Sequence, residues 1–142
     1  MPTGDSENVL LTSNQMKWIA APPTLPPGVR MVVIEGNPGK AGPFTMRLWF
    51  PAGTRVAPHF HPGVEHATVI SGSAQWGMGE KFEPDKLRTM PAGSFIMICA
   101  GSPHFGQITE DTVIQAHGVG PWQTIYVNPA DNPAASRTSA SQ

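Results

Sequence analysis

Short runs of apolar residues, separated by turn-forming residues, dominate the chain and predict β-strands. The clearest run is FTMRLWF at 44–50, where every second side chain is apolar, so one face of the strand can be buried. Further runs of this kind are VRMVVIEG, EHATVIS, SAQWGMG, SFIMIC, DTVIQAHGVG and WQTIYV. We expect about eight to ten short strands, no convincing helix, and a hairpin between EHATVIS and SAQWGMG across Gly72.

The two ends of the chain differ from this pattern and set the expected domain limits. Residues 1–29 are a polar segment followed by the proline-rich stretch AAPPTLPPG, which suits an extended arm better than a paired strand. Residues 30–127 hold the strand pattern, and 128–142 are rich in Pro, Ala, Ser and Asn, which predicts a flexible tail. The middle therefore predicts one all-β domain: a sandwich, a jelly roll or a small barrel.

Composition narrows the possible partners. The chain has 142 residues, a charged fraction of 13% and a net charge of −1, so we expect neither a nucleic-acid nor a membrane partner. No signal peptide or membrane-length apolar run is visible, so the expected location is cytoplasmic. The single cysteine, Cys99, excludes an internal disulfide and is expected to be a small buried side chain.

Three of the five histidines lie in HFHPGVEH, residues 59–66. His59 and His61 are two apart, which places both rings on one face of a strand. The turn at Pro62-Gly63 can return Glu65 toward the same point, and strand alternation places His66 on the opposite face. An H-x-H pair alone is common and often has no metal, so the prediction depends on the whole cluster.

His104 is the candidate fourth ligand, because it follows the turn AGSP at the entry of another strand. Taken alone, such a histidine is more often a loop residue bonded to the backbone. Three neutral imidazoles and one carboxylate would form a mixed nitrogen and oxygen site that suits a divalent first-row transition metal. We therefore expect one such ion per chain, and Fe, Mn, Co, Ni, Cu and Zn all suit a site of this kind.

Two segments resemble the sequence motifs of the cupin superfamily, and in particular of small bacterial single-domain cupins. The first motif matches at every position, and the second matches at three positions but has Cys99 and Ile108 where proline and asparagine are usual. The matching residues are Gly53, His59, His61, Glu65 and Gly72 in the first segment and Gly93, Gly101 and His104 in the second.

The resemblance implies a cupin-type jelly-roll β-barrel, also called a double-stranded β-helix, with the metal inside near one open end. By the family pattern the ligands would be His59, His61, Glu65 and His104. Cupins are often dimers, so we expect a homodimer in which the arm at 18–30 could reach the partner chain.

Four protein ligands leave about two positions of a six-coordinate ion open, so the site could act on a small-molecule substrate. The predicted function is a metal-dependent enzyme. Metal-site chemistry and the frequency of such enzymes among cupins favour an oxygenase, with Fe as the favoured ion. The alternatives are a non-redox isomerase, lyase or hydrolase, and a cupin that binds a metal or small ligand without catalysis. Candidate pocket residues or supports of the ligands are Gln115 and His117, with Trp76, Arg47 or Trp49 as wall residues and His66 as a further candidate.

Overall fold

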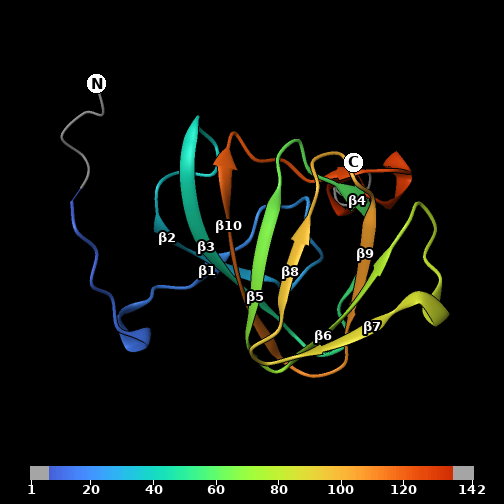
Figure 1. Cartoon of the computed structure of the whole chain (residues 1–142), viewed down its shortest axis with the longest axis horizontal. Helices are drawn as coiled ribbons and strands as arrows, with labels where there is room; N and C mark the ends of the chain where they lie inside the picture. The colour runs from blue at the N-terminus through green and yellow to red at the C-terminus, as the bar shows by residue number, and fades with distance from the viewer. Residues whose placement is uncertain (1–6, 136–142) are drawn as a thin grey trace.

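Residues 7–135 are described by the structure, a computed structural model, and they form two antiparallel β-sheets that face each other (Figure 1). The six-stranded sheet has the order β1 (Ile19–Ala20), β2 (Arg30–Glu35), β3 (Gly42–Phe50), β10 (Thr112–Gly120), β5 (Glu65–Ser71) and β8 (Phe95–Ile98). The five-stranded sheet has the order β11 (Ile125–Tyr126), β4 (Arg55–Phe60), β9 (His104–Ile108), β6 (Ser73–Met78) and β7 (Arg88–Pro91). Short 3-10 helices lie at Ser13–Gln15, Pro84–Lys86 and Pro129–Asp131. The predicted all-β jelly roll is confirmed.

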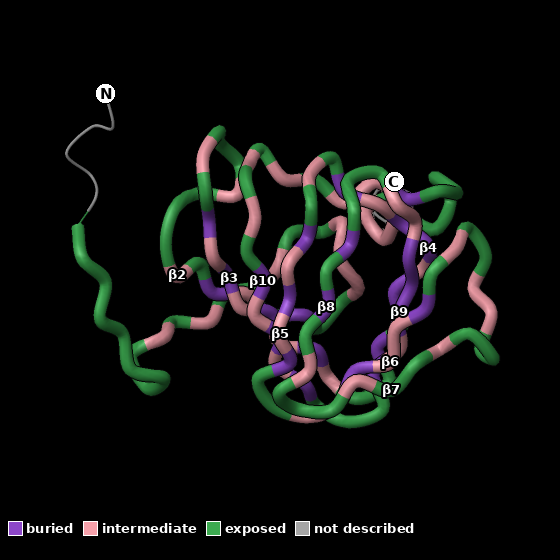
Figure 2. Tube along the Cα trace, in the orientation of Figure 1, coloured by how far each residue is buried: buried purple, intermediate pink, exposed green. Residues whose placement is uncertain are grey.

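The core lies between the sheets, where the inward side chains of both meet (Figure 2). In β3 the alternation read from the sequence is the alternation of burial: Phe44, Met46, Leu48 and Phe50 are buried, and the residues between them are partly exposed. β10 pairs with β3 along its whole length and buries Ile114 in the same core. Burying a side chain of this size stabilises the fold by about 1.5–3 kcal/mol.

The predicted hairpin across Gly72 is wrong. β5 pairs with β10 and β8 in one sheet, whereas β6 pairs with β7 and β9 in the other. Gly72 has a φ of +78°, and a Cβ added there would lie 2.3 Å from the carbonyl oxygen of Asp111. The turn at Gly72 therefore carries the chain from one sheet to the other and packs closely against the segment that enters β10.

The proline-rich arm lies against the chain's own barrel. β1 pairs with β2 through Ile19 and Met31, so the arm does contribute a short paired strand. Beyond it, the Tyr126 hydroxyl donates a hydrogen bond to the carbonyl oxygen of Thr24. This contact ties the arm to the end of the domain instead of leaving it extended into solvent.

The first part of the predicted C-terminal tail forms a short capped turn. In this turn, the Asn128 side chain accepts a hydrogen bond from the Ala130 amide at 3.1 Å and caps a 3-10 helix. Residues 136–142 of the predicted tail lie outside the described residues.

Cys99 is exposed, contrary to expectation, because it continues the alternation of β8, in which Ile96 and Ile98 face inward. No helix within residues 7–135 has the length and apolar character needed to cross a bilayer.

Candidate metal centre

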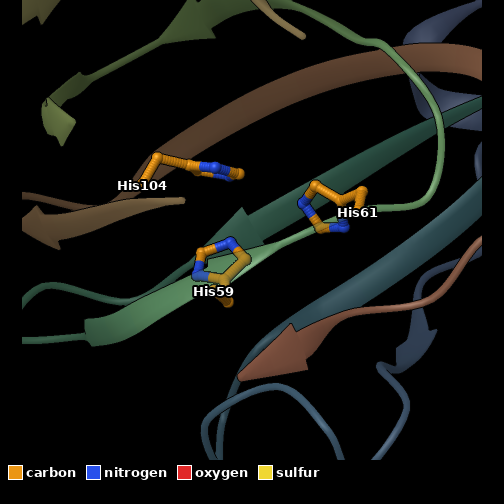
Figure 3. A group of neighbouring side chains, drawn as sticks. All are labelled: His59, His61 and His104. Carbon is orange, nitrogen blue, oxygen red and sulfur yellow. The ribbon is translucent and has the colours of Figure 1, made fainter. Parts of the chain in front are cut away.

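Three histidines converge on one point inside the barrel (Figure 3). His59 of β4 and His104 of β9 are direct cross-strand partners, and His61 lies one residue beyond the end of β4. One ring nitrogen from each of the three lies within 4.8 Å of the others. All three side chains are buried, and His104 has no exposed surface. The structure thus brings together the three imidazoles that the sequence placed on two separate strands.

Backbone carbonyl groups fix the orientation and tautomer of these rings. The Nδ1 atoms of His59, His61 and His104 lie 2.7, 2.7 and 3.0 Å from carbonyl oxygens. The three acceptors belong to Ala57, Gln123 and Ser102. A carbonyl oxygen only accepts a hydrogen bond, so each Nδ1 carries the proton and each Nε2 keeps a free lone pair. This is the arrangement in which histidine binds a metal through Nε2.

Glu65 approaches the same point from the opposite sheet, as the first residue of β5. Its Oε1 atom lies 3.4 Å from His104 Nε2 and 3.8 Å from His61 Nε2. Both Glu65 Oε1 and His104 Nε2 are buried and have no hydrogen-bond partner among the described residues. Two buried acceptors that face each other without a donor are costly, and a cation between them would satisfy both. The donor set therefore fits a divalent transition metal.

The buried environment keeps the candidate ligands in the protonation states that bind metal. Burial, with smaller contributions from His104 and His61, lowers the pKa of His59 from 6.5 to about 3. Burial also lowers the pKa of His61. For Glu65 burial acts to raise the pKa, but the adjacent imidazoles outweigh it and the pKa lies below its usual value. At neutral pH these two imidazoles are therefore uncharged and the carboxylate is ionised.

A cavity of about 480 Å³ opens beside these side chains, and His59, His61 and Glu65 form part of its wall. Most of the remaining wall is apolar: Leu25 of the arm, Met31 and Val33 of β2, Met46, Leu48 and Phe50 of β3, Val56, Ile108, Ile114, Ala116, Trp76 and Trp122. A cavity of this size and character is typical of sites for small organic molecules.

Of the expected pocket residues, Trp76 lines the cavity, whereas Gln115 and His117 do not. β10 turns Ile114 and Ala116 inward, so strand alternation places Gln115 and His117 on the outer face of the sheet. The expectation that Gln115 and His117 line the pocket is therefore wrong, because both side chains face away from the cavity.

The outer face has its own contacts, which account for the other candidate residues. The Arg47 Nε–H donates a 2.9 Å hydrogen bond to Gln115 Oε1, and Trp49 follows the same alternation on β3. His66 stacks on His117 with ring centroids 4.8 Å apart and planes 3° from parallel. None of these side chains lines the cavity. His66 thus faces away from Glu65, as its position in the strand predicted.

The segment that follows β10 supports the centre in a way that the sequence analysis missed. Trp122 stacks on the His61 ring, with centroids 4.5 Å apart and planes 20° from parallel, and the next residue supplies the carbonyl that accepts the His61 Nδ1–H. Both Trp122 and Gln123 also line the cavity. A tryptophan in the short PWQT connection was the available signal, but nothing in its spacing relates it to the histidines.

Two facing antiparallel sheets, with a histidine cluster between them, define a cupin fold, the double-stranded β-helix. The family profile of the ChrR cupin-like domain matches residues 6–123, so the chain belongs to this family. A search of curated proteins found no significant match.

Three solved structures illustrate the range of proteins with a similar fold. The polyketide cyclase RemF from Streptomyces resistomycificus is 15% identical, with 93% of this chain and 94% of that chain covered and a TM-score of 0.73. A candidate acetylacetone dioxygenase from Methylibium petroleiphilum PM1 is 19% identical, with 99% of both chains covered and a TM-score of 0.68. The Rhodobacter sphaeroides complex of SigE with the anti-sigma ChrR is 21% identical over 75% of this chain and 51% of that chain, with a TM-score of 0.56. At these identities the likeness shows the fold.

Proposed function

We propose that the chain is a mononuclear metal-dependent enzyme, an oxygenase, that acts on a small organic molecule in the barrel cavity. The observation that carries the proposal is the position of His59, His61 and Glu65 in the wall of an apolar cavity of about 480 Å³, with His104 beside them. Glu65 would be the fourth ligand, because its unpartnered Oε1 faces His104 Nε2. A structural metal site normally leaves no ligand position facing open space, whereas these ligands border a cavity.

Each protein group has a definable part in this function. The Nε2 atoms of the three histidines and the Glu65 carboxylate would hold the ion, and the carboxylate offsets part of its charge. A divalent ion bound there supplies Lewis acidity and, when it is iron, one-electron chemistry toward dioxygen. Trp122 and the backbone carbonyls keep the imidazoles oriented. The apolar wall excludes water from the bound substrate.

The cavity wall favours chemistry at the metal over general acid and base catalysis by the protein. Among the described residues that line it, only His59, His61 and Glu65 can titrate, and all three belong to the proposed ligand set. A lyase or hydrolase commonly needs a separate proton donor or acceptor within hydrogen-bond reach of the substrate. The candidate dioxygenase among the similar structures supports the same choice, and the polyketide cyclase keeps the non-redox alternative open.

Family membership favours a second candidate function, in which the domain binds a metal and small ligand as the input of a regulatory partner. The chain belongs to the ChrR cupin-like family, and one structure with a similar fold contains the anti-sigma ChrR bound to SigE. In this case the same cavity would bind a ligand tightly without converting it.

The experiment that separates these functions uses the full chain loaded with Fe(II) under anaerobic conditions. We expect oxygen uptake when air and a panel of uncharged diketones and phenols are supplied, and none with the His104→Ala variant. A Zn(II)-loaded sample provides the matched redox-inert control. Product formation with zinc and without oxygen would instead support the non-redox enzyme, and ligand binding without any product would support the regulatory domain.

A further inference from the structure

We propose that the cavity takes an organic molecule with an uncharged, apolar body, whose oxygen atoms lie at the metal centre and beside Trp76. The inference deepens the proposed function by naming its substrate class. Binding itself requires no turnover, so the two can be tested separately.

The wall of the cavity carries little charge. Among the described residues that line the cavity, Glu65 is the only one with a charged side chain at neutral pH, and it belongs to the metal centre. Arg47 lies between two lining residues of β3, Met46 and Leu48, but alternation turns it to the outer face, where it bonds Gln115. A carboxylate or phosphate far from the metal would therefore be buried without a cation, which is strongly unfavourable.

Three of the strands that line the cavity present no polar side chain to it. The lining residues of β2, β3 and β10 are all apolar: Met31, Val33, Met46, Leu48, Phe50, Ile114 and Ala116. The polar lining side chains Thr24, Asn37, Gln123 and Thr124 lie outside the strands, in connecting segments. A sugar would lose most of its hydrogen bonds to water in such a cavity, whereas a flat apolar body would lose few.

The indole of Trp76 lines the cavity and stacks on the His104 ring, with centroids 6.4 Å apart and planes 13° from parallel. Its Nε1–H group is buried and has no hydrogen-bond partner among the described residues. Buried donors are nearly always satisfied, and an oxygen of a molecule bound in the cavity that Trp76 lines would supply the acceptor. Trp76 would thus position an oxygen-bearing ligand next to the centre.

The test compares two probes that differ in one distal charge, 2-naphthol and 6-hydroxy-2-naphthoate. Calorimetric titration of the full chain in its metal-free form measures binding at neutral pH. We expect 2-naphthol to bind about tenfold more tightly than 6-hydroxy-2-naphthoate, because the added carboxylate has no cation to pair with in this form. Equal or tighter binding of 6-hydroxy-2-naphthoate, or no binding of either probe, would overturn the inference.

Two variants, with one control variant, test the role of the Trp76 donor and the role of wall charge separately. Trp76→Phe keeps an aromatic side chain, although a smaller one, and removes the donor. 2-Naphthol should therefore lose about three- to tenfold more affinity than naphthalene, which has no oxygen to accept the Nε1–H. Trp49→Phe makes the same change on the outer face and should alter neither. Met31→Arg introduces a cation at a half-buried lining position and should remove or reverse the preference for 2-naphthol. Unchanged 2-naphthol affinity in Trp76→Phe would contradict the role of the Trp76 donor. An unchanged preference in Met31→Arg would contradict the role of wall charge.

These measurements remain informative if the proposed enzyme activity fails. Discrimination between the probes without oxygen uptake by the iron-loaded protein would leave the ligand class in place and remove the oxygenase. Oxygen uptake without discrimination would leave the oxygenase in place and remove the ligand class.

Discussion

At the scale of single residues, the centre depends on which ring nitrogen of each histidine carries the proton. Carbonyl oxygens of Ala57, Gln123 and Ser102 accept hydrogen bonds from the three Nδ1–H groups, so each Nε2 keeps the free lone pair that a metal would need. The side chains of this set were predictable, because the spacing of histidines and glutamate along the strands defines their faces. The supporting carbonyls were not predictable, because any residue can supply one and only the folded chain brings Gln123 beside His61.

Removing one imidazole tests the ligand set directly. We expect His61→Ala to lower the metal content by about tenfold or more, because three donors hold an ion less tightly than four. His66→Ala removes a histidine from the same cluster of the sequence, but on the outer face, and should retain the metal. Plasma emission spectroscopy of both variants measures the content, and equal loss in the two would contradict the assignment.

The lowered pKa of His59 predicts how the metal-free protein responds to acid. Its pKa is about 3 in the folded state and 6.5 when exposed, so between these values the unfolded chain binds the extra proton. Stability should therefore fall as the pH falls from about 6.5 toward 3, by an amount on the order of a few kcal/mol. Urea unfolding at pH 7 and pH 4.5 checks this, with His59→Asn expected to show a smaller loss. A loss of equal size in the variant would assign the effect to other groups.

At the scale of elements, the strand pattern predicted which segments become strands but not every pairing. The runs at β3, β5 and β10 have one buried face each, as their alternation required. The expected β5–β6 hairpin failed because a glycine between two strands fits a tight turn within one sheet and a crossing between two sheets equally well. That choice is made by long-range packing, here by the close approach of Gly72 to Asp111.

Substituting two glycines with similar backbone conformations separates the cost of the left-handed conformation from the cost of a close contact. Gly72 and Gly93 have φ values of +78° and +90°, but only Gly72 would place an added Cβ against another part of the chain. Gly93→Ala should cost about 1–2 kcal/mol of unfolding free energy from the left-handed conformation alone. Gly72→Ala carries the same cost plus the clash with Asp111 and should be clearly less stable. Urea denaturation measures both, and equal losses would show that the close approach does not matter.

At the scale of the whole molecule, the centre exists because the barrel closes. His59, His61 and His104 come from the five-stranded sheet and its adjoining loop, whereas Glu65 begins a strand of the six-stranded sheet. The arm then places Leu25 in the cavity wall, where Tyr126 helps to hold it. The sequence motifs indicated the barrel and the candidate ligands, but the role of the arm could not be predicted, because its proline-rich composition specifies an extended path and no destination.

The most direct test is anomalous diffraction from crystals of the full chain loaded with Zn(II), collected on both sides of the zinc absorption edge. We predict one strong peak per chain, about 2.0–2.2 Å from Nε2 of the three histidines and from a Glu65 carboxylate oxygen. An absence of density among these four side chains in fully loaded protein, or a peak bound only elsewhere on the surface, would contradict this prediction.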